Sequence, residues 1–206
     1  MLDYNTIKIG IVDLKINNLH SIYNAFKKIG YKTKIINNNK DLKNQDFIVL
    51  PGVGAFKEGM NALKKNNLIE CLKENVIVKK KNIIGICLGM QMLFTVSNEQ
   101  GNNSGLNFVK GKVKIFKKKR DFSIPVIGWY KVKSPVEQLN HKYFYHIHSY
   151  YCDPINKKIV LSETKYQGFS YCSSIQDKNI LAFQFHPEKS GVNGINLIKK
   201  IPQFYK

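Results

Sequence analysis

The sequence predicts an α/β fold in which helices flank an open mixed sheet, with additional antiparallel strands in the C-terminal half. Two observations carry this prediction. Up to about residue 86, short apolar runs alternate with segments whose apolar residues recur at helical spacing, which is typical of βαβ units. After Gly105 the pattern changes to short β-branched or aromatic runs, as antiparallel and mixed strands show.

The first half is expected to alternate strands and helices. Turn-forming residues separate the segments, and the polar run Asn37-Asn38-Asn39 is expected to close the second strand. The predicted strands cover residues 7–12, 32–36, 46–50 and 82–86, and the predicted helices cover residues 19–29, about 55–63 and about 68–79.

The second half is expected to be mostly strands, followed by a C-terminal helix. The predicted strands cover residues 108–116, 129–132, 143–148, 159–164, 168–175 and 180–185, and residues 197–201 belong to the helix. No internal repeat or linker divides the chain, so one domain over residues 1–206 is expected.

The composition is typical of a globular domain with one hydrophobic core. The chain has 206 residues, of which 43% are hydrophobic, enough for one substantial core. No apolar run approaches the roughly 20 residues of a membrane span, and no signal-peptide pattern is visible, so a cytoplasmic location without membrane contact is expected. The four cysteines have no CxxC spacing and are expected to be free thiols.

The formal net charge of +19 raises the question of nucleic-acid binding. Surfaces that bind phosphates normally use arginine as well as lysine, and Arg120 is the only arginine here. The lysines are spread along the chain, so we interpret them as solvated surface residues and expect no nucleic-acid partner. A basic patch at residues 117–120 remains the alternative.

The segment Gly85-Ile86-Cys87-Leu88-Gly89-Met90-Gln91 is the most informative motif. An apolar strand runs into it and a helical pattern beginning at Met90 follows, so Cys87 lies in a tight turn between strand and helix, a nucleophile elbow. The dipole of the helix favours negative charge on the sulfur. The alternative for a single cysteine is a small buried apolar side chain.

A second motif, Phe185-His186-Pro187-Glu188, ends an alternating strand about a hundred residues later. His186 can accept the thiol proton and return it to a leaving amine, and Glu188 can orient the imidazole. His146 and His148 alternate in another strand and face the same side, as a metal pair would. They lack a third ligand at suitable spacing, so we predict a structural or pocket-lining role, with no metal and no cofactor.

With the turn Pro51-Gly52-Val53-Gly54, these blocks resemble those of the class I (triad) glutamine amidotransferases, in which Cys, His and Glu hydrolyse the side-chain amide of glutamine. Further segments are similar, in order and spacing, to the glutaminase subunits of imidazole glycerol phosphate synthases. These segments include residues 9–13, 18–19, 51–60, 128–129, 148–150 and 187–191, so the resemblance covers essentially the whole chain.

The resemblance implies a role for each matching residue. Cys87, His186 and Glu188 would form the catalytic triad, and the amides of Val53 and Leu88 would hold the oxyanion of the tetrahedral intermediate. The residues that would contact the L-glutamine substrate are Gly52, Gln91, Glu99, His148, Ser149 and Tyr150. For Glu99, an exposed loop acid is an equally good interpretation.

The resemblance also implies a partner. The glutaminase subunits pass ammonia to a (β/α)8 barrel cyclase, which makes imidazole glycerol phosphate and aminoimidazole carboxamide ribotide in histidine biosynthesis. This chain has no room for the barrel, so we expect a heterodimer with a separate cyclase subunit. The docking face would include Asn18, Trp129, Tyr145 and Lys189.

Some residues depart from the family pattern. These departures affect the predicted identity of the partner and leave the predicted triad unchanged. Leu14-Lys15-Ile16-Asn17 replaces a glycine-rich turn, Tyr130 follows Trp129 where Asn is usual, and His146 replaces an apolar aromatic residue. Paralogous glutaminases that supply ammonia for amidino groups on surface sugars are similar, notably at residues 171–175, and are one alternative. A non-catalytic docking protein with a glutaminase fold is another.

Overall fold

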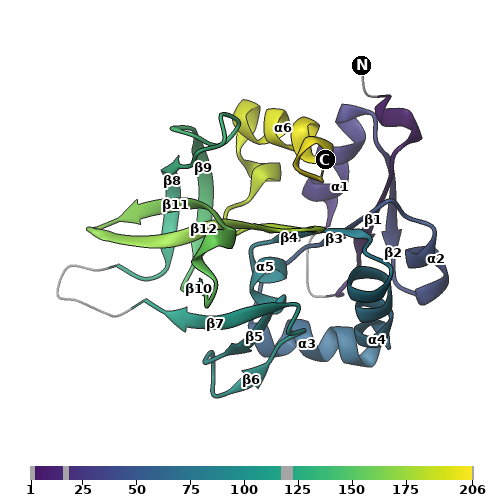
Figure 1. Ribbon diagram of the computed structural model, residues 1–206, viewed down its shortest axis with the longest axis horizontal. Coiled ribbons are helices and arrows are strands. Elements are labelled where there is room, and N and C mark those ends of the chain that lie inside the picture. Colours follow the sequence, from purple (N-terminus) through teal and green to yellow (C-terminus); the bar gives the residue numbers. More distant parts are fainter. Residues whose placement is uncertain (1–2, 16–18, 117–122, 206) are drawn as a thin grey trace.

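The computed structural model describes residues 3–15, 19–116 and 123–205. Its N-terminal half is a parallel sheet with helical connections (Figure 1). The strands are β1 (Lys8–Val12), β2 (Lys32–Ile36), β3 (Phe47–Leu50) and β4 (Asn82–Ile86), and β13 (Ile180–Phe183) joins them from the far end of the chain. They lie in the order β2-β1-β3-β4-β13, and every neighbouring pair is parallel.

The sheet continues beyond β13 with mostly antiparallel strands, as the sequence predicts. The order continues as β12-β10-β7-β5-β6, and β11 connects β12 to the β8–β9 pair. These strands are β5 (Phe94–Ser97), β6 (Asn103–Ser104), β7 (Val109–Ile115), β8 (Val126–Lys133), β9 (Tyr143–His148), β10 (Tyr150–Pro154), β11 (Val160–Tyr166) and β12 (Phe169–Asp177).

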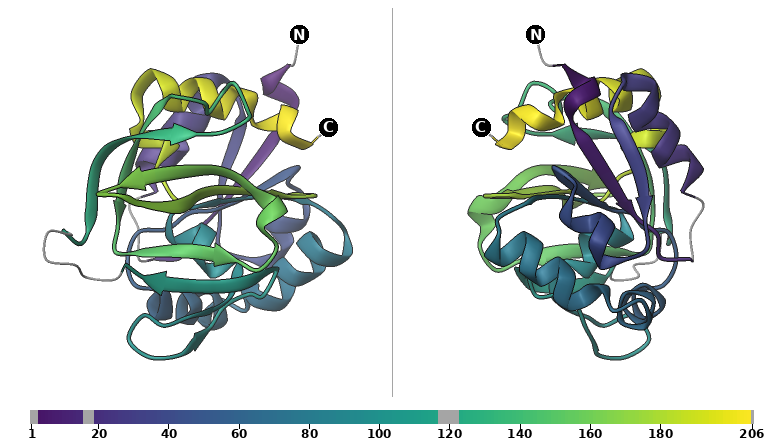
Figure 2. Two further views of the ribbon diagram at one scale, coloured as in Figure 1. Left: turned by 60° about the vertical axis from the view of Figure 1, so that its left-hand side comes forward. Right: turned by 90° about the vertical axis from the view of Figure 1, so that its right-hand side faces the viewer.

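Helices cover both faces of the parallel strands. Helices α1 (His20–Ile29) and α6 (Gly191–Lys200) pack together on one face, as both views of Figure 2 show. On the other face lie α3 (Phe56–Lys65), α4 (Leu68–Lys73) and α5 (Leu88–Met92), below the sheet in Figure 1. The short helix α2 (Asn39–Lys43) packs beside α4, and a π-helical turn (Glu74–Val78) prolongs α4.

Alternation along the central strands supplies both cores. In β3, Phe47 and Val49 belong to the core under α1 and α6, whereas Ile48 and Leu50 belong to the core under α3, α4 and α5. Since all four side chains are buried, β3 reads as a continuous apolar run rather than an alternating one. This double burial fixes the strand, and with it the turn that follows Leu50.

The structure differs from the sequence prediction in several places, and the strands β5, β6 and β10 were not predicted. The Asn run closes β2 as predicted, but it then begins the unpredicted helix α2, which the Asn38 side chain caps by accepting a hydrogen bond from the Asp41 amide at 2.9 Å. The helix after Cys87 ends at Met92, since Phe94 and the β-branched residues after it enter β5 and pair with β7. The C-terminal helix α6 contains residues 197–200 as predicted, but Ile201 already belongs to the 3-10 turn that follows.

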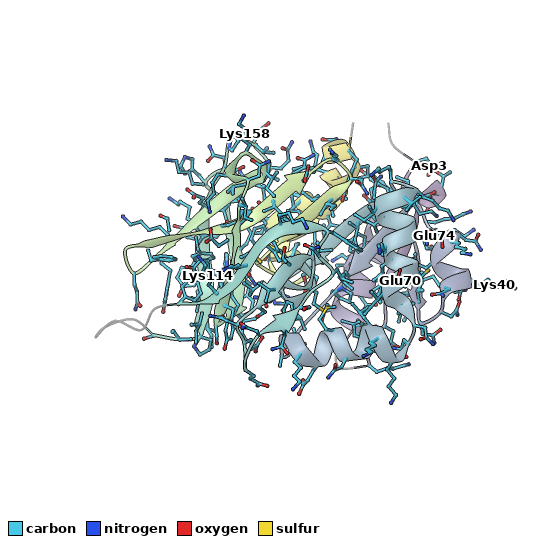
Figure 3. The ribbon with its side chains drawn as sticks, turned by 60° about the horizontal axis from the view of Figure 1, so that its bottom comes forward. Asp3, Lys40, Glu70, Glu74, Lys114 and Lys158 are labelled. Carbon is cyan, nitrogen blue, oxygen red and sulfur yellow. The ribbon has the colours of Figure 1, made fainter. Side chains whose placement is uncertain are left out.

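Charged side chains are dispersed over the described surface. The labelled lysines Lys40, Lys114 and Lys158 come from α2, β7 and the 3-10 turn Lys157–Ile159, and they lie well apart in Figure 3. The candidate basic patch at residues 117–120 lies outside the described residues. Within the described ranges, no helix has both the length and the apolar character needed to cross a membrane.

Candidate active site

Three parallel strands end at the same edge of the sheet and place the predicted triad there. Strand β3 leads into Gly52, β4 into Cys87 and β13 into His186. Ligands of open α/β sheets bind outside the carboxyl ends of the strands. Residues from motifs more than thirty positions apart in the sequence therefore meet at one edge.

Cys87 has the backbone of a nucleophile elbow. Its φ of 51° and ψ of −108° are unusual for a residue with a side chain, and its amide donates to the Phe183 carbonyl at 2.7 Å. The close approach of α5 to β3 requires Gly89, because a Cβ there would lie 1.8 Å from the Leu50 carbonyl oxygen. The expected turn between strand and helix is confirmed.

His186 and Glu188 form a buried hydrogen-bonded pair. The Nδ1 atom of His186 lies 2.7 Å from Oε1 of Glu188, and the two side chains are 1% and 3% exposed. Burial by itself lowers the pKa of His186, but the adjacent Cys87 sulfur and the Glu188 carboxylate raise it to about 10. Among the described residues, Nε2 of His186 has no partner with hydrogen-bond geometry.

The backbone of the histidine is held by β9 and by Ser190. The His186 amide donates to the Tyr145 carbonyl at 2.9 Å, and Ser190 Oγ donates to the His186 carbonyl at 2.6 Å. The same Oγ accepts from the Tyr145 amide at 2.9 Å. The turn η4 (Pro187–Lys189) is thus fixed at both ends, which places Glu188 under the imidazole.

The amides of Val53 and Leu88, the predicted oxyanion donors, do not form an oxyanion hole in this structure. The amide of Leu88 donates to the Gly52 carbonyl oxygen at 3.3 Å, so the Gly52–Val53 peptide directs its C=O toward the position of the oxyanion. A Cβ on Gly52 would lie 2.4 Å from Leu88 Cβ, so only glycine permits this approach. In this conformation the Leu88 donor is already occupied.

A cavity of about 260 Å³ opens beside Cys87, near the small end of the range for small-molecule sites. Its lining contains Val53, Gly54, Cys87, Leu88, Gln91, Glu99, Pro125, Ile147, His148, Ser149 and Tyr150. Every residue predicted to contact glutamine is therefore at this cavity except Gly52. Gly52 instead lines a second cavity of about 80 Å³, together with His186, Glu188 and Lys189.

Glu99 is more than an exposed loop acid. Its Oε2 accepts a hydrogen bond from the Phe56 amide at 2.9 Å, at the first residue of α3, and its side chain is only partly exposed. A carboxylate at a helix N-terminus is stabilised by the free amides and the dipole. Glu99 therefore links the loop after β5 to the turn that carries Val53.

The predicted histidine pair lies on one side of β9, with His146 Nδ1 3.3 Å from His148 Nε2. Burial lowers the pKa of His148 to about 3, so His148 is neutral, and its Nδ1 donates to the Tyr150 carbonyl at 2.9 Å. His146 lies behind it against the Tyr171 hydroxyl, at 2.9 Å. No three His, Cys, Asp or Glu side chains gather as metal ligands in the described parts of the chain.

Two of the predicted docking residues are neighbours on the outer face of β8 and β9. Trp129 lies directly opposite Tyr145, with ring centroids 6.0 Å apart, and Trp129 is 51% exposed. Lys189 is exposed on η4, beside the smaller cavity. Asn18 lies outside the described residues.

Sequence reasoning missed four residues of the site. Pro125 and Ile147 line the main cavity, Ser190 anchors the histidine backbone, and Gln184 contacts the Cys87 sulfur. Gln184 and Ser190 both flank the histidine motif. A signal for Gln184 existed, because a polar residue at the buried end of an apolar strand needs a partner.

Known proteins resemble this chain over nearly its whole length. The family model of the class-I glutamine amidotransferases matches residues 10–201. The imidazole glycerol phosphate synthase subunit HisH 1 of Campylobacter jejuni is 42% identical over 93% of this chain and 97% of its own length. Subunit HisH of Chlorobaculum tepidum is 36% identical over 94% of this chain and 98% of its own.

Solved structures show the same fold at low sequence identity. PurLQS from Thermotoga maritima superposes with a TM-score of 0.76 at 15% identity, over 97% of this chain and 99% of that one. The glutaminase domain of CTPS from Trypanosoma brucei gives a TM-score of 0.66 at 14% identity, over 98% of this chain and 95% of that one. The chain belongs to the class-I glutamine amidotransferase family and, within it, to the HisH subunits of imidazole glycerol phosphate synthase.

Proposed function

We propose that this chain hydrolyses L-glutamine to glutamate and ammonia, with Cys87 as the nucleophile. The Cys87 thiolate attacks the side-chain amide carbon, and His186 gives its proton to the leaving ammonia, which leaves a glutamyl thioester. Water then attacks the thioester while His186 accepts its proton, and glutamate and the thiol are released. Glu188 holds the imidazole in the required orientation throughout.

One observation above all supports this mechanism, the buried His186–Glu188 pair beside a cysteine in an elbow. The elevated pKa of His186, about 10, keeps the imidazole protonated next to the sulfur at neutral pH. A protonated imidazole and a thiolate stabilise each other, which is the resting form such a nucleophile needs. A docking protein without catalysis would not need this arrangement in a strained turn.

The ammonia is proposed to pass to a separate (β/α)8 barrel cyclase that makes imidazole glycerol phosphate and aminoimidazole carboxamide ribotide in histidine biosynthesis. The name of the HisH relatives supports the pathway, and their similarity extends over nearly the whole chain. The cavity of about 80 Å³ between the triad and Lys189 offers a route from His186 toward the proposed docking face.

The outer face of β8 and β9 supports the proposed heterodimer. Ile127 pairs with Ile147, Trp129 with Tyr145 and Lys131 with Tyr143, so these side chains share one face of the two strands. Ile127, Trp129 and Tyr143 are each about half exposed, at 52%, 51% and 48%. An exposed apolar stripe of this kind is typical of a protein interface. Because Ile147 also lines the main cavity, the stripe begins at the active site.

The test separates glutamine hydrolysis from use of the ammonia. In the complex with the barrel cyclase, His186→Ala should abolish the glutamine-dependent reaction and leave the reaction with added ammonium salt unchanged. His141→Ala, at an exposed histidine away from the triad, serves as the matched control and should keep both reactions.

Loss of both reactions in an assembled His186→Ala complex would contradict the separation of the two sites. If glutamine hydrolysis occurs only with a partner that builds amidino groups on a surface sugar, the proposed pathway would be that of surface-sugar modification rather than histidine biosynthesis. If no partner gives glutamate release, the chain would instead be a non-catalytic docking protein.

A further inference from the structure

A chain of buried amides connects the nucleophile to the substrate pocket. Gln184 follows β13 and is fully buried, with Nε2 3.7 Å from the Cys87 sulfur. Its Oε1 accepts from Gln91 Nε2 at 3.2 Å, and Gln91 Nε2 also donates to the Tyr150 carbonyl at 3.2 Å. None of the sequence motifs assigned a role to Gln184.

The hydrogen bonds fix the orientation of both amide groups. The Tyr150 carbonyl can only accept, so Gln91 must direct its NH₂ group toward it. The same NH₂ group faces Gln184, whose oxygen must therefore point to Gln91. Gln184 is left with its own NH₂ group against the Cys87 sulfur, as a donor.

The strand geometry explains why Gln184 reaches the sulfur. Phe183 pairs with Ile86 in the parallel ladder between β13 and β4, so Gln184 and Cys87 are the next residues on each strand. The Gln184 amide is held by the Ser173 carbonyl at 2.9 Å. Gln184 and His186 are two residues apart just beyond the end of β13, and the Cys87 sulfur lies beside both side chains. The segment after β13 thus brings both side chains to one sulfur, and Gln184 is the one that donates to it.

We propose that Gln184 is an N–H donor that stabilises the thiolate of Cys87. In the thiol form the sulfur can donate to the Ile147 carbonyl, at 3.8 Å, but a thiolate can only accept and needs donors. Gln184 supplies one that does not titrate. The inference rests on the proposed role of Cys87 as the nucleophile.

The same network restricts what Gln91 can do in the pocket. Both protons of its NH₂ group are directed to protein acceptors, so Oε1 is the group that remains for the substrate. The pocket therefore presents an acceptor at this position and selects a substrate that offers an N–H. Substrate held by Gln91 would also hold Gln184 against the sulfur.

The test measures the reactivity of the sulfur directly. Alkylation of Cys87 by iodoacetamide reports the thiolate and can be followed on the Cys87 peptide by mass spectrometry. Gln184→Met removes the donor at similar volume, and Gln184→Glu keeps the acceptor for Gln91 while placing an oxygen against the sulfur. Gln45→Met is the matched control, because Gln45 is also a buried glutamine but precedes β3, at the opposite end of the strands.

Both Gln184 variants should slow alkylation at about pH 8 by roughly 10- to 100-fold, the range for losing one hydrogen bond to a charged group. The rate-against-pH curve should move to higher pH, while kcat falls more than KM rises. Gln45→Met should match the wild type. Circular dichroism and thermal unfolding establish that each variant is folded.

Wild-type alkylation rates in a folded Gln184→Met or Gln184→Glu protein would overturn the inference. Slow alkylation in Gln184→Met but not in Gln184→Glu would also overturn it. That result would mean that Gln184 acts only as the acceptor that holds Gln91. Failure of the proposed function appears differently, as a wild-type protein whose glutamine hydrolysis does not depend on Cys87. The two failures are therefore distinguishable.

Discussion

Docking of the cyclase partner is expected to switch the glutaminase on by reversing the Gly52–Val53 peptide. In the structure of the lone chain, the Gly52 carbonyl accepts from the Leu88 amide, so neither predicted donor serves an oxyanion. Reversal of this peptide would free the Leu88 N–H and turn the Val53 N–H toward the same point. The turn lies beside the proposed docking face, since Gly52, Val53 and Lys189 line one cavity.

The magnitudes indicate a switch that a partner can operate. A backbone hydrogen bond of 3.3 Å is long, and such bonds contribute about 0.5–1.5 kcal/mol net. That hydrogen bond alone would leave the reversed peptide populated to roughly a tenth to a third in the lone chain, so a rise of about 10²–10³ requires docking to favour the reversed peptide by about 2.7–4 kcal/mol. Each oxyanion donor gained is worth about 10²–10³ in kcat. Turnover in the liganded complex should therefore exceed that of the lone chain by about this factor.

The assay is steady-state glutamate release by the lone chain, by the complex, and by the complex with the ligand of the synthase bound. The expected order is lone chain, complex, liganded complex, with a total rise of about 10²–10³ or more. Equal turnover in all three samples would show that the oxyanion hole is permanently formed, and the coupling between the two sites would have to be abandoned.

Two further predictions concern the charge on the histidine and the packing of the elbow. Glu188→Gln removes one of the charges that raise the pKa of His186 to about 10, so the imidazole should lose its proton at lower pH. The alkaline limb of the pH profile for kcat/KM should then move to lower pH, and an unchanged limb would refute the role of the carboxylate. Gly89→Ala places a Cβ 1.8 Å from the Leu50 carbonyl oxygen and should lower the free energy of unfolding by about 1–3 kcal/mol or more. Urea unfolding measures this loss, and an unchanged midpoint would mean that α5 can move away from β3 at no cost.

Local signals in the sequence predicted much of the geometry around Cys87 and His186. The glycines around Cys87 require a tight turn, and a histidine followed two residues later by a glutamate can form the pair seen here. The parallel strands were predictable from βαβ alternation, and parallel strands bring their carboxyl ends to one edge. The elbow and the His186–Glu188 pair therefore follow from residues close together in the chain.

Features that depend on distant partners were not predictable in the same way. Glu99 caps α3 through an amide 43 residues away, so a loop acid and a pocket residue looked alike in the sequence. Gln184 contacts Gln91 at a separation of 93 residues, and that contact depends on the register of β13 against β4. The orientation of the Gly52–Val53 peptide depends on a single hydrogen bond between two strand ends.

The most direct test of the account is glutamate release by the Cys87→Ser protein in the assembled complex. A serine hydroxyl holds its proton far more tightly than a thiol does, so His186 cannot generate the nucleophile. Glutamate release should fall to background while the variant folds and binds the cyclase as the wild type does. Turnover like that of the wild type in the purified Cys87→Ser complex would remove Cys87 from the nucleophile role and contradict the proposed mechanism.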